Sequence, residues 1–196
     1  MSDNNVEYYD ENADNFFERT VNADVSEVRE RFLKYIPEGG KILDAGCGSG
    51  RDSKAFLEAG YDVISFDASV EMCKRASKYI GRRVIQMRFE NMAFDDTFAG
   101  IWACASLLHV SAEKLPAVLG KLNSLLRVSG VLYASFKYGE GRKVIGKRVF
   151  SDFTEKSIVP LFQAAGFAIV SNVVGADSRP ERADEKWINI IGMKKL

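Results

Sequence analysis

Short apolar segments alternate with longer amphipathic segments along most of this chain. Segments rich in β-branched and aromatic residues predict five strands, at 41–46, 61–67, 82–88, 99–106 and 130–136. Between the last two, residues 113–127 repeat leucine and valine at helical spacing on one face. Strands that alternate with helices pair in parallel, so the pattern predicts an α/β fold with helices on both faces of the sheet.

The two ends of the chain depart from this alternation. Before residue 40, Val28, Phe32 and Ile36 mark an amphipathic helix, and the segment at 8–20 predicts another ahead of it.

After the fifth strand, a predicted helix at 154–166 leads into a strand at 167–174. The last strand, 186–195, follows a polar loop that predicts no helix. Because a parallel return requires a crossover connection, these last two strands are predicted to form an antiparallel hairpin.

Composition narrows the class of protein. The 196 residues carry 27 acidic and 27 basic side chains, and this balance argues against a general nucleic-acid binder. No apolar run approaches the roughly 20 residues of a membrane-spanning helix. The acidic start of the chain resembles neither a signal nor a transit peptide. Three cysteines without metal-ligand spacing favour a reducing cytoplasm.

A glycine-rich turn follows the first predicted strand, in the stretch ILDAGCGSGRD. Gly46, Gly48 and Gly50 give the spacing GxGxG, and Arg51 stands where a dinucleotide fingerprint would place its third glycine. Strand, glycine turn and helix start together predict a ligand site at the carboxyl ends of parallel strands.

Two acidic residues indicate the kind of ligand. Asp67 ends the second predicted strand and would hold a ribose, which suits NAD and S-adenosylmethionine equally. Asp44 lies beside the turn, where an acid disfavours a pyrophosphate and suits a ligand with ammonium and sulfonium groups. The alternatives are that Asp44 accepts hydrogen bonds from nearby amides and that Asp67 caps the helix starting near Ser69.

DAGCGSG, with FDAS downstream, resembles the class I S-adenosylmethionine-dependent methyltransferases over nearly the whole chain. GCGSGRDS, IWACASLLHV and YASFKYGEG are similar to its tellurite-resistance and thiopurine-like small-molecule branch. The resemblance implies a single-domain Rossmann-like fold with sheet order 3-2-1-4-5-7-6, strand 7 being antiparallel. It also implies a helical cap or lid over residues 1–40, a methyltransferase core over residues 41–196, and S-adenosylmethionine as cofactor with S-adenosylhomocysteine as product.

The resemblance assigns a cofactor-binding role to residues along these segments. The glycine turn would hold the methionine part, the end of the second strand the ribose, and the segment after the third strand the adenine. Carbonyl groups ending the fourth strand would accept from the methionine ammonium, and the lid would add two polar side chains. The implied cofactor residues are Tyr9, Thr20, Asp44, Gly46, Cys47, Gly48, Gly50, Arg51, Asp67, Ala68, Ser69, Phe89, Glu90, Asn91, Ala103 and Cys104.

The end of the fourth strand narrows the acceptor chemistry. Residues 103–106 lack the two prolines of exocyclic amino methylases and the Pro-Cys nucleophile of cytosine C5 methylases, and Cys104 is interpreted as a packed small residue. No cluster of acids suited to magnesium is found, so no metal is predicted. His109, the single histidine, is either a general base or an oriented core residue.

Basic and polar residues near the same sheet edge are the candidate acceptor-binding residues. They are Lys137, Tyr138 and Arg142 after the fifth strand, with Arg179 and Arg182 between the last two strands. They would bind an anionic acceptor, unless they are surface charges on solvated loops.

We therefore expect a cytoplasmic methyltransferase, monomeric or homodimeric, acting on a small molecule such as a thiol, a metalloid or an anionic metabolite. The alternatives are an NAD(P)-dependent oxidoreductase, a non-catalytic binding module, and a methyltransferase of tRNA or protein. The basic run from Lys74 to Arg88 keeps the RNA alternative open.

Overall fold

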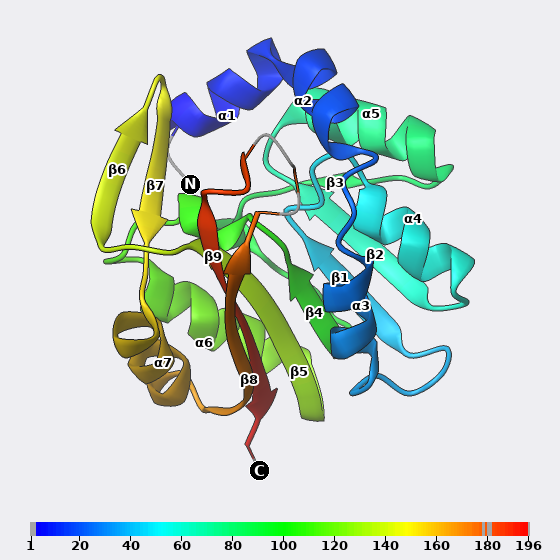
Figure 1. Cartoon of the computed structure of the whole chain (residues 1–196). Helices are drawn as coiled ribbons and strands as arrows, with labels where there is room; N and C mark the ends of the chain where they lie inside the picture. The colour runs from blue at the N-terminus through cyan, green and yellow to red at the C-terminus, as the bar shows by residue number, and fades with distance from the viewer. Residues whose placement is uncertain (1–2, 178, 180–181, 196) are drawn as a thin grey trace.

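Seven strands form one sheet in the order β3-β2-β1-β4-β5-β9-β8, in a computed structural model that describes residues 3–177, 179 and 182–195 (Figure 1). Strands β1 to β5 pair in parallel, whereas β9 is antiparallel to both of its neighbours. The strands of this sheet are β1 (Lys41–Ala45), β2 (Asp62–Asp67), β3 (Ile85–Gln86), β4 (Phe98–Ala103), β5 (Leu126–Lys137), β8 (Phe167–Ala176) and β9 (Lys186–Lys194).

The sheet confirms the predicted fold class. Its order is the expected 3-2-1-4-5-7-6 with the last two labels changed, because a separate hairpin takes the numbers β6 and β7. The final pair is antiparallel as predicted, with Phe167 opposite Lys194 at one end and Ala176 opposite Lys186 at the other.

Helices cover both faces of the sheet. The helices are α1 (Asp3–Glu11), α2 (Ala13–Thr20), α3 (Ser26–Leu33), α4 (Arg51–Glu58), α5 (Val70–Ile80), α6 (Leu115–Leu125) and α7 (Glu155–Ala164). Side chains alternate along a strand, so Ile42 and Leu43 of β1 belong to two different core clusters. The cluster of Ile42 contains Phe32 of α3 and Phe56 of α4, and the cluster of Leu43 contains residues of α6 and α7.

Two helices, α1 and α2, stand where a single helix over 8–20 was predicted. The chain turns at Asn12, whose side-chain amide donates to the carbonyl of Tyr8 at 2.8 Å. Both helices cross the top of the molecule in Figure 1. The next helix, α3, lies against a sheet face, where Phe32 is fully buried.

A hairpin of β6 (Gly141–Ile145) and β7 (Arg148–Asp152) corrects the sequence interpretation, which placed no strand between residues 138 and 153. Its turn contains Gly146 at φ +60°, a conformation that glycine adopts readily. β6 is exposed throughout, whereas the end of β7 is buried. The β-branched residues on both sides of Gly146 carried the signal for this hairpin.

Three predicted elements were longer than those in the structure. The helix predicted at 113–127 ends at Leu125, because Leu126 already pairs with Phe98 of β4. The strand predicted at 99–106 ends at Ala103, since the chain turns into a 3₁₀ helix (Leu107–His109) through Ala105 at φ +50°. The strand predicted at 82–88 is shortened to Ile85 and Gln86, the two residues that pair with β2.

None of the helices in the described part of the chain is long and apolar enough to cross a bilayer.

Candidate functional site

A cavity of about 570 Å³ lies at the carboxyl ends of the parallel strands, where open α/β sheets bind their ligands. The turn after β1 and the ends of β2 and β4 form one part of its wall. Further lining residues belong to the helices α1, α2 and α3, the strands β5, β7 and β9, and the segment after β8. Parts of the chain that are far apart in sequence therefore meet at one site.

The glycine turn after β1 lies close against its neighbours. Gly46, Gly48 and Gly50 have φ values of +78°, +53° and +79°. The amide of Gly46 donates to the carbonyl of Phe66 at 2.9 Å, which holds the turn against β2. A Cβ on Gly46 would lie 2.5 Å from the Cβ of Ser106. Both the backbone conformation and the available space therefore require glycine at position 46.

Asp67 joins the end of β2 to the glycine turn. Its Oδ2 accepts from the amide of Gly48 and its Oδ1 from the amide of Ser69, each at 2.9 Å. Burial raises the pKa of Asp67 above its ordinary value. The N-cap of α5 is Ser69, whose hydroxyl accepts from the amide of Met72 at 3.0 Å. Asp67 thus lines the cavity, and the capping role belongs to Ser69.

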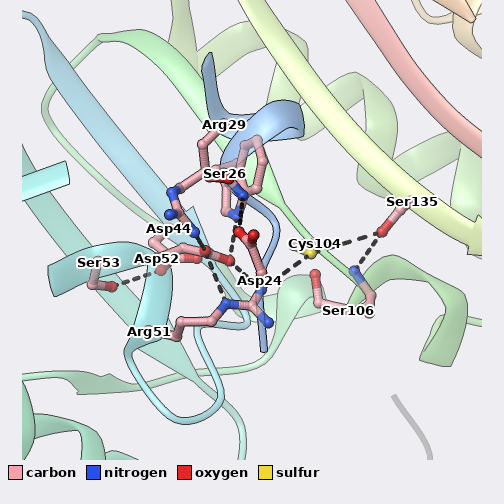
Figure 2. Close-up of polar contacts among 12 residues, drawn as sticks. Asp24, Ser26, Arg29, Asp44, Arg51, Asp52, Ser53, Cys104, Ser106 and Ser135 are labelled. Atoms are coloured by element: carbon pink, nitrogen blue, oxygen red, sulfur yellow. Dashed lines mark hydrogen bonds and ion pairs between the residues drawn. The ribbon is translucent and has the colours of Figure 1, made fainter. Parts of the chain in front are cut away.

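A charge cluster surrounds Asp52 at the start of α4 (Figure 2). Arg51 Nη2 lies 2.6 Å from Asp52 Oδ2, and Arg29 Nη1 lies 2.9 Å from Asp52 Oδ1. The indole N–H of Trp102 also donates to Asp52, at 2.9 Å. Burial alone would raise the pKa of Asp52, but Arg51, Trp102 and Arg29 together lower it. Asp52 is therefore an ionised, compensated carboxylate.

Asp44 is the contrasting carboxylate of the same region. Its Oδ2 accepts from the hydroxyl of Ser53 at 2.6 Å (Figure 2). Burial, followed by the charge of Asp52, raises the pKa of Asp44 to about 7. A cation placed beside Asp44 would lower this pKa and be attracted by the ionised form. The cavity therefore offers one carboxylate that a cationic ligand would stabilise.

Cys104, at the end of β4, lies 3.6 Å from Arg51 Nη2 and 4.0 Å from the hydroxyl of Ser135 (Figure 2). Burial raises the pKa of the Cys104 thiol to about 11. A thiol protonated at neutral pH is a poor nucleophile, which supports the interpretation of Cys104 as a packed residue.

His109 uses both ring nitrogens in contacts within the protein. Nδ1 lies 3.0 Å from the carbonyl of Val149, so we assign the ring proton to Nδ1. Nε2 then accepts from the hydroxyl of Tyr9 at 2.8 Å. Burial lowers the pKa of His109 to about 4 and raises that of Tyr9 to about 12. This geometry favours the oriented core residue among the two interpretations of His109.

The structure places fifteen of the predicted site residues on the cavity wall. They are Tyr9, Thr20, Asp44, Gly46, Cys47, Gly48, Arg51, Asp67, Ala68, Phe89, Cys104, His109, Lys137, Arg179 and Arg182. Seven others do not line it, namely Gly50, Ser69, Glu90, Asn91, Ala103, Tyr138 and Arg142. Gly50 and Ser69 serve the local backbone, as the N-cap residues of α4 and α5. Arg142 lies on the exposed strand β6.

Residues 42–130 match the family described as the methyltransferase domain. The matched segment includes the glycine turn after β1 and the ends of β2 and β4. Over 107 residues the chain is 36% identical to the malonyl-[acyl-carrier protein] O-methyltransferase of Pectobacterium atrosepticum. The aligned segment covers 53% of this chain and 42% of that protein. The chain thus spans less than half the length of this relative.

Solved structures of methyltransferases share the whole fold. The Burkholderia thailandensis 1,6-didemethyltoxoflavin-N1-methyltransferase, solved with 1,6-didemethyltoxoflavin and S-adenosylhomocysteine, has a TM-score of 0.80 and 22% identity, covering 98% of this chain and 88% of its own. The magnesium protoporphyrin IX methyltransferase of Synechocystis, solved with S-adenosylhomocysteine, has a TM-score of 0.74 and 16% identity, covering 97% and 98%. At these identities the likeness shows the fold.

Three of the predicted acceptor-binding cations at this cavity already face carboxylates. Lys137 lies 2.6 Å from Glu185, and Arg182 lies 3.3 Å from the other oxygen of the same residue. Arg179 lies 2.6 Å from Asp177. Two carboxylates thus face three cations, so the charge of these cations is compensated in part inside the protein.

Two cavity-lining arginines were missed by the sequence interpretation. Arg19 lies in the last turn of α2, next to the predicted Thr20, and is exposed. Arg148 begins β7, in the hairpin that was not predicted. The spacing of the predicted helix could have indicated Arg19, whereas Arg148 required the hairpin to be recognised first.

Within the residues that the structure describes, no group of three or more histidine, cysteine or acidic side chains is placed to hold a metal ion.

Proposed function

We propose that this chain transfers the methyl group of S-adenosylmethionine to a small-molecule acceptor. The observation that carries the proposal is the glycine turn, which is flanked by the carboxylates of Asp44 and Asp67 at one cavity. The family match over residues 42–130 and the two fold neighbours solved with S-adenosylhomocysteine support it.

Each side of the turn suits a different part of this cofactor. Gly46 and Gly48 would let the methionine part approach the backbone, and Asp44 would attract its ammonium and the sulfonium. Asp67 would accept from the ribose hydroxyls, and Phe89 would pack beside the adenine. Arg19 is the cation that we assign to the methionine carboxylate, since it lines the cavity and is exposed.

Methyl transfer from a sulfonium requires an aligned nucleophile more than an acid or a base. The protein would contribute chiefly by holding the acceptor atom, the methyl carbon and the sulfur in line. His109 would act as a positioning residue, because its Nε2 accepts from Tyr9 and its Nδ1 donates to Val149. This arrangement suits an acceptor such as a thiol, a metalloid or an anionic metabolite, whose nucleophile needs no strong base.

The placement within the tellurite-resistance and thiopurine-like branch remains our hypothesis, carried by GCGSGRDS and YASFKYGEG. The division into a cap over residues 1–40 and a core over residues 41–196 also remains a proposal. Its support is that α1 and α2 line the cavity while the glycine turn belongs to the core.

Calorimetry with purified protein tests the proposed function. We expect S-adenosylmethionine and S-adenosylhomocysteine to bind at one site per chain, and NADH and NADPH not to bind. S-adenosylmethionine and S-adenosylhomocysteine should each raise the melting temperature of the protein, because each binds only the folded state. Binding of NADH without binding of S-adenosylhomocysteine would replace this proposal by the oxidoreductase alternative. Labelled methyl transfer to fractionated small molecules, tRNA and protein would then identify the acceptor class.

A further inference from the structure

Arg148 differs from the other cations around the cavity wall formed by β7 and the segment after β8. Lys137, Arg179 and Arg182 each lie within ion-pair distance of a carboxylate. No carboxylate of the described residues lies within that distance of Arg148, although its side chain is half-buried. An incompletely compensated cation inside a cavity indicates a place for an anion.

Aromatic rings fix the guanidinium of Arg148. Its central carbon lies 4.5 Å from the ring centroid of Tyr8 and 5.2 Å from that of Phe150. Its Nε is buried and finds no hydrogen-bond acceptor among the residues that the structure describes. Burial raises the pKa of Tyr9, and the charge of the Arg148 guanidinium near the Tyr9 hydroxyl opposes that rise. Arg148 is therefore held in place by these rings, and its Nε makes no hydrogen bond within the described residues.

The hairpin that carries Arg148 is tied to the rest of the site at the next residue. The amide of Val149 donates to Asn5 Oδ1 at 2.7 Å, and its carbonyl accepts from Asn5 Nδ2 at 3.0 Å. The same carbonyl accepts from His109 Nδ1. These contacts join β7 to α1 and to the 3₁₀ helix after β4, so Arg148 has a defined position relative to the cavity.

We propose that Arg148 binds an oxyanion of the methyl acceptor, and that the acceptor has a planar, largely apolar body. The inference rests on the proposed function, because it deepens the description of the same cavity. A guanidinium donates two parallel N–H groups that match a carboxylate or a phosphate. The rings of Tyr8 and Phe150 lie against the guanidinium, so we assign the anion to the N–H groups that the rings do not cover. Aromatic side chains that line the same cavity, including Trp187, suit a flat body attached to that group.

The test measures small-anion binding to protein saturated with S-adenosylhomocysteine. The probes are benzoate, phenyl phosphate and benzamide, which share a ring and differ in charge. We expect benzoate or phenyl phosphate to bind in calorimetry and benzamide not to bind. The stronger of the two anions identifies a carboxylate or a phosphate on the natural acceptor. Failure of both anions to bind, or equal binding of benzamide, overturns the inference.

Variants assign the binding to Arg148. Arg148→Met should weaken the anion at least about tenfold, because a charge-assisted pair is lost. Arg148→Lys keeps the charge but lacks the paired N–H groups, so it should weaken anion binding less. This variant also tests the role of Arg148 if Arg148→Met folds poorly. Arg142→Met is the matched control, since Arg142 is an exposed cation on the same hairpin that does not line the cavity. Equal losses in Arg142→Met and Arg148→Met would contradict a specific role for Arg148.

Affinity for S-adenosylhomocysteine separates the two proposals. It should remain within about twofold of the unmodified protein in Arg148→Met, because the guanidinium is assigned to the acceptor and not to the cofactor. If the unmodified protein fails to bind S-adenosylhomocysteine, the proposed function fails. If it binds the cofactor product but neither anion, only the role of Arg148 fails.

Discussion

The hydroxyl of Tyr9 lies 2.8 Å from Nε2 of His109, although 100 positions separate the two residues in sequence. Tyr9 belongs to α1, and His109 ends the 3₁₀ segment after β4. This hydrogen bond therefore fastens the first helix to the edge of the sheet where the cavity lies. Both partners are buried, so the energy of the bond is not screened by solvent.

Tyr9→Phe should destabilise the protein without altering its packing. Removal of the hydroxyl leaves His109 Nε2 buried and unpaired, which costs about 1–3 kcal/mol of the free energy of unfolding. Urea unfolding measures this loss.

Tyr8→Phe is the control for Tyr9→Phe, because Tyr8 is the adjacent tyrosine of the same helix and keeps its ring contact with Arg148. It should change the free energy of unfolding by less than about 0.5 kcal/mol. Equal losses in the two variants would contradict the importance of the bond to His109.

His109 should make the protein less stable as the pH falls from about 6.5 towards 4. Its pKa is about 4 in the folded chain and near 6.5 when unfolded, so only the unfolded state takes up a proton in this range. The contribution is complete above pH 6.5 and decreases by up to about 1.4 kcal/mol per pH unit below it.

Asp44 acts in the opposite direction, because its raised pKa makes the folded state take up a proton below about pH 7. The comparison must therefore be made against His109→Gln, which keeps Asp44 and removes the titrating ring. The difference in free energy of unfolding between the two proteins should shrink from pH 7 to pH 5. A difference that does not change with pH would exclude His109 as its source.

The sheet and the glycine turn could be predicted from sequence because both depend on local patterns. Glycines spaced two apart, as at Gly46, Gly48 and Gly50, indicate a turn from the sequence alone. The alternation of strands and helices defines the topology. The environment of Arg148 could not be predicted, since it depends on how a separate hairpin packs against α1. The same holds for Lys137, whose neutralisation by Glu185 is a contact between β5 and the segment before β9. Pairing of charges across the fold is a tertiary property.

Gly46→Ala should be more damaging than an alanine at another glycine of positive φ. A left-handed conformation alone costs an alanine about 1–2 kcal/mol. At Gly46, with φ +78°, the new Cβ would also lie 2.5 Å from Ser106 Cβ. Gly60, with φ +86° and nothing within 4 Å of its Cβ position, isolates the conformational cost. Chemical denaturation should show a greater loss of stability in Gly46→Ala than in Gly60→Ala. Calorimetry should show weaker binding of S-adenosylhomocysteine only in Gly46→Ala. Similar behaviour of both variants would contradict the close approach.

Asp67→Asn should weaken the binding of S-adenosylhomocysteine at least about tenfold, because the carboxylate that we propose accepts from the ribose hydroxyls becomes an amide. The amide oxygen can still accept from one of the two backbone N–H groups that Asp67 now binds, so the fold should survive. Asp62→Asn, on an exposed residue at the other end of β2, should leave the affinity unchanged. Calorimetry on both variants measures the difference, and unchanged affinity in Asp67→Asn would contradict the ribose assignment.

Asp44 should make the affinity for S-adenosylmethionine depend on pH. With a pKa of about 7 in the free protein, the carboxyl is protonated below that pH and ionised above it. A cationic ligand favours the ionised form, so binding below about pH 7 must release a proton. The affinity should fall by up to tenfold for each pH unit below about 7 and become independent of this group above it.

Asp44→Asn isolates the contribution of Asp44 from that of Asp67, whose pKa is also raised by burial. Asp52 does not titrate in this range, because Arg51 and Arg29 keep it ionised. Calorimetry at pH 8, 7 and 6, in buffers of different ionisation enthalpy, measures both the affinity and the number of protons released. The Asn variant should bind more weakly at pH 8 and show a smaller pH dependence. If it kept the full dependence of the unmodified protein, another group would be the one that binds the cation.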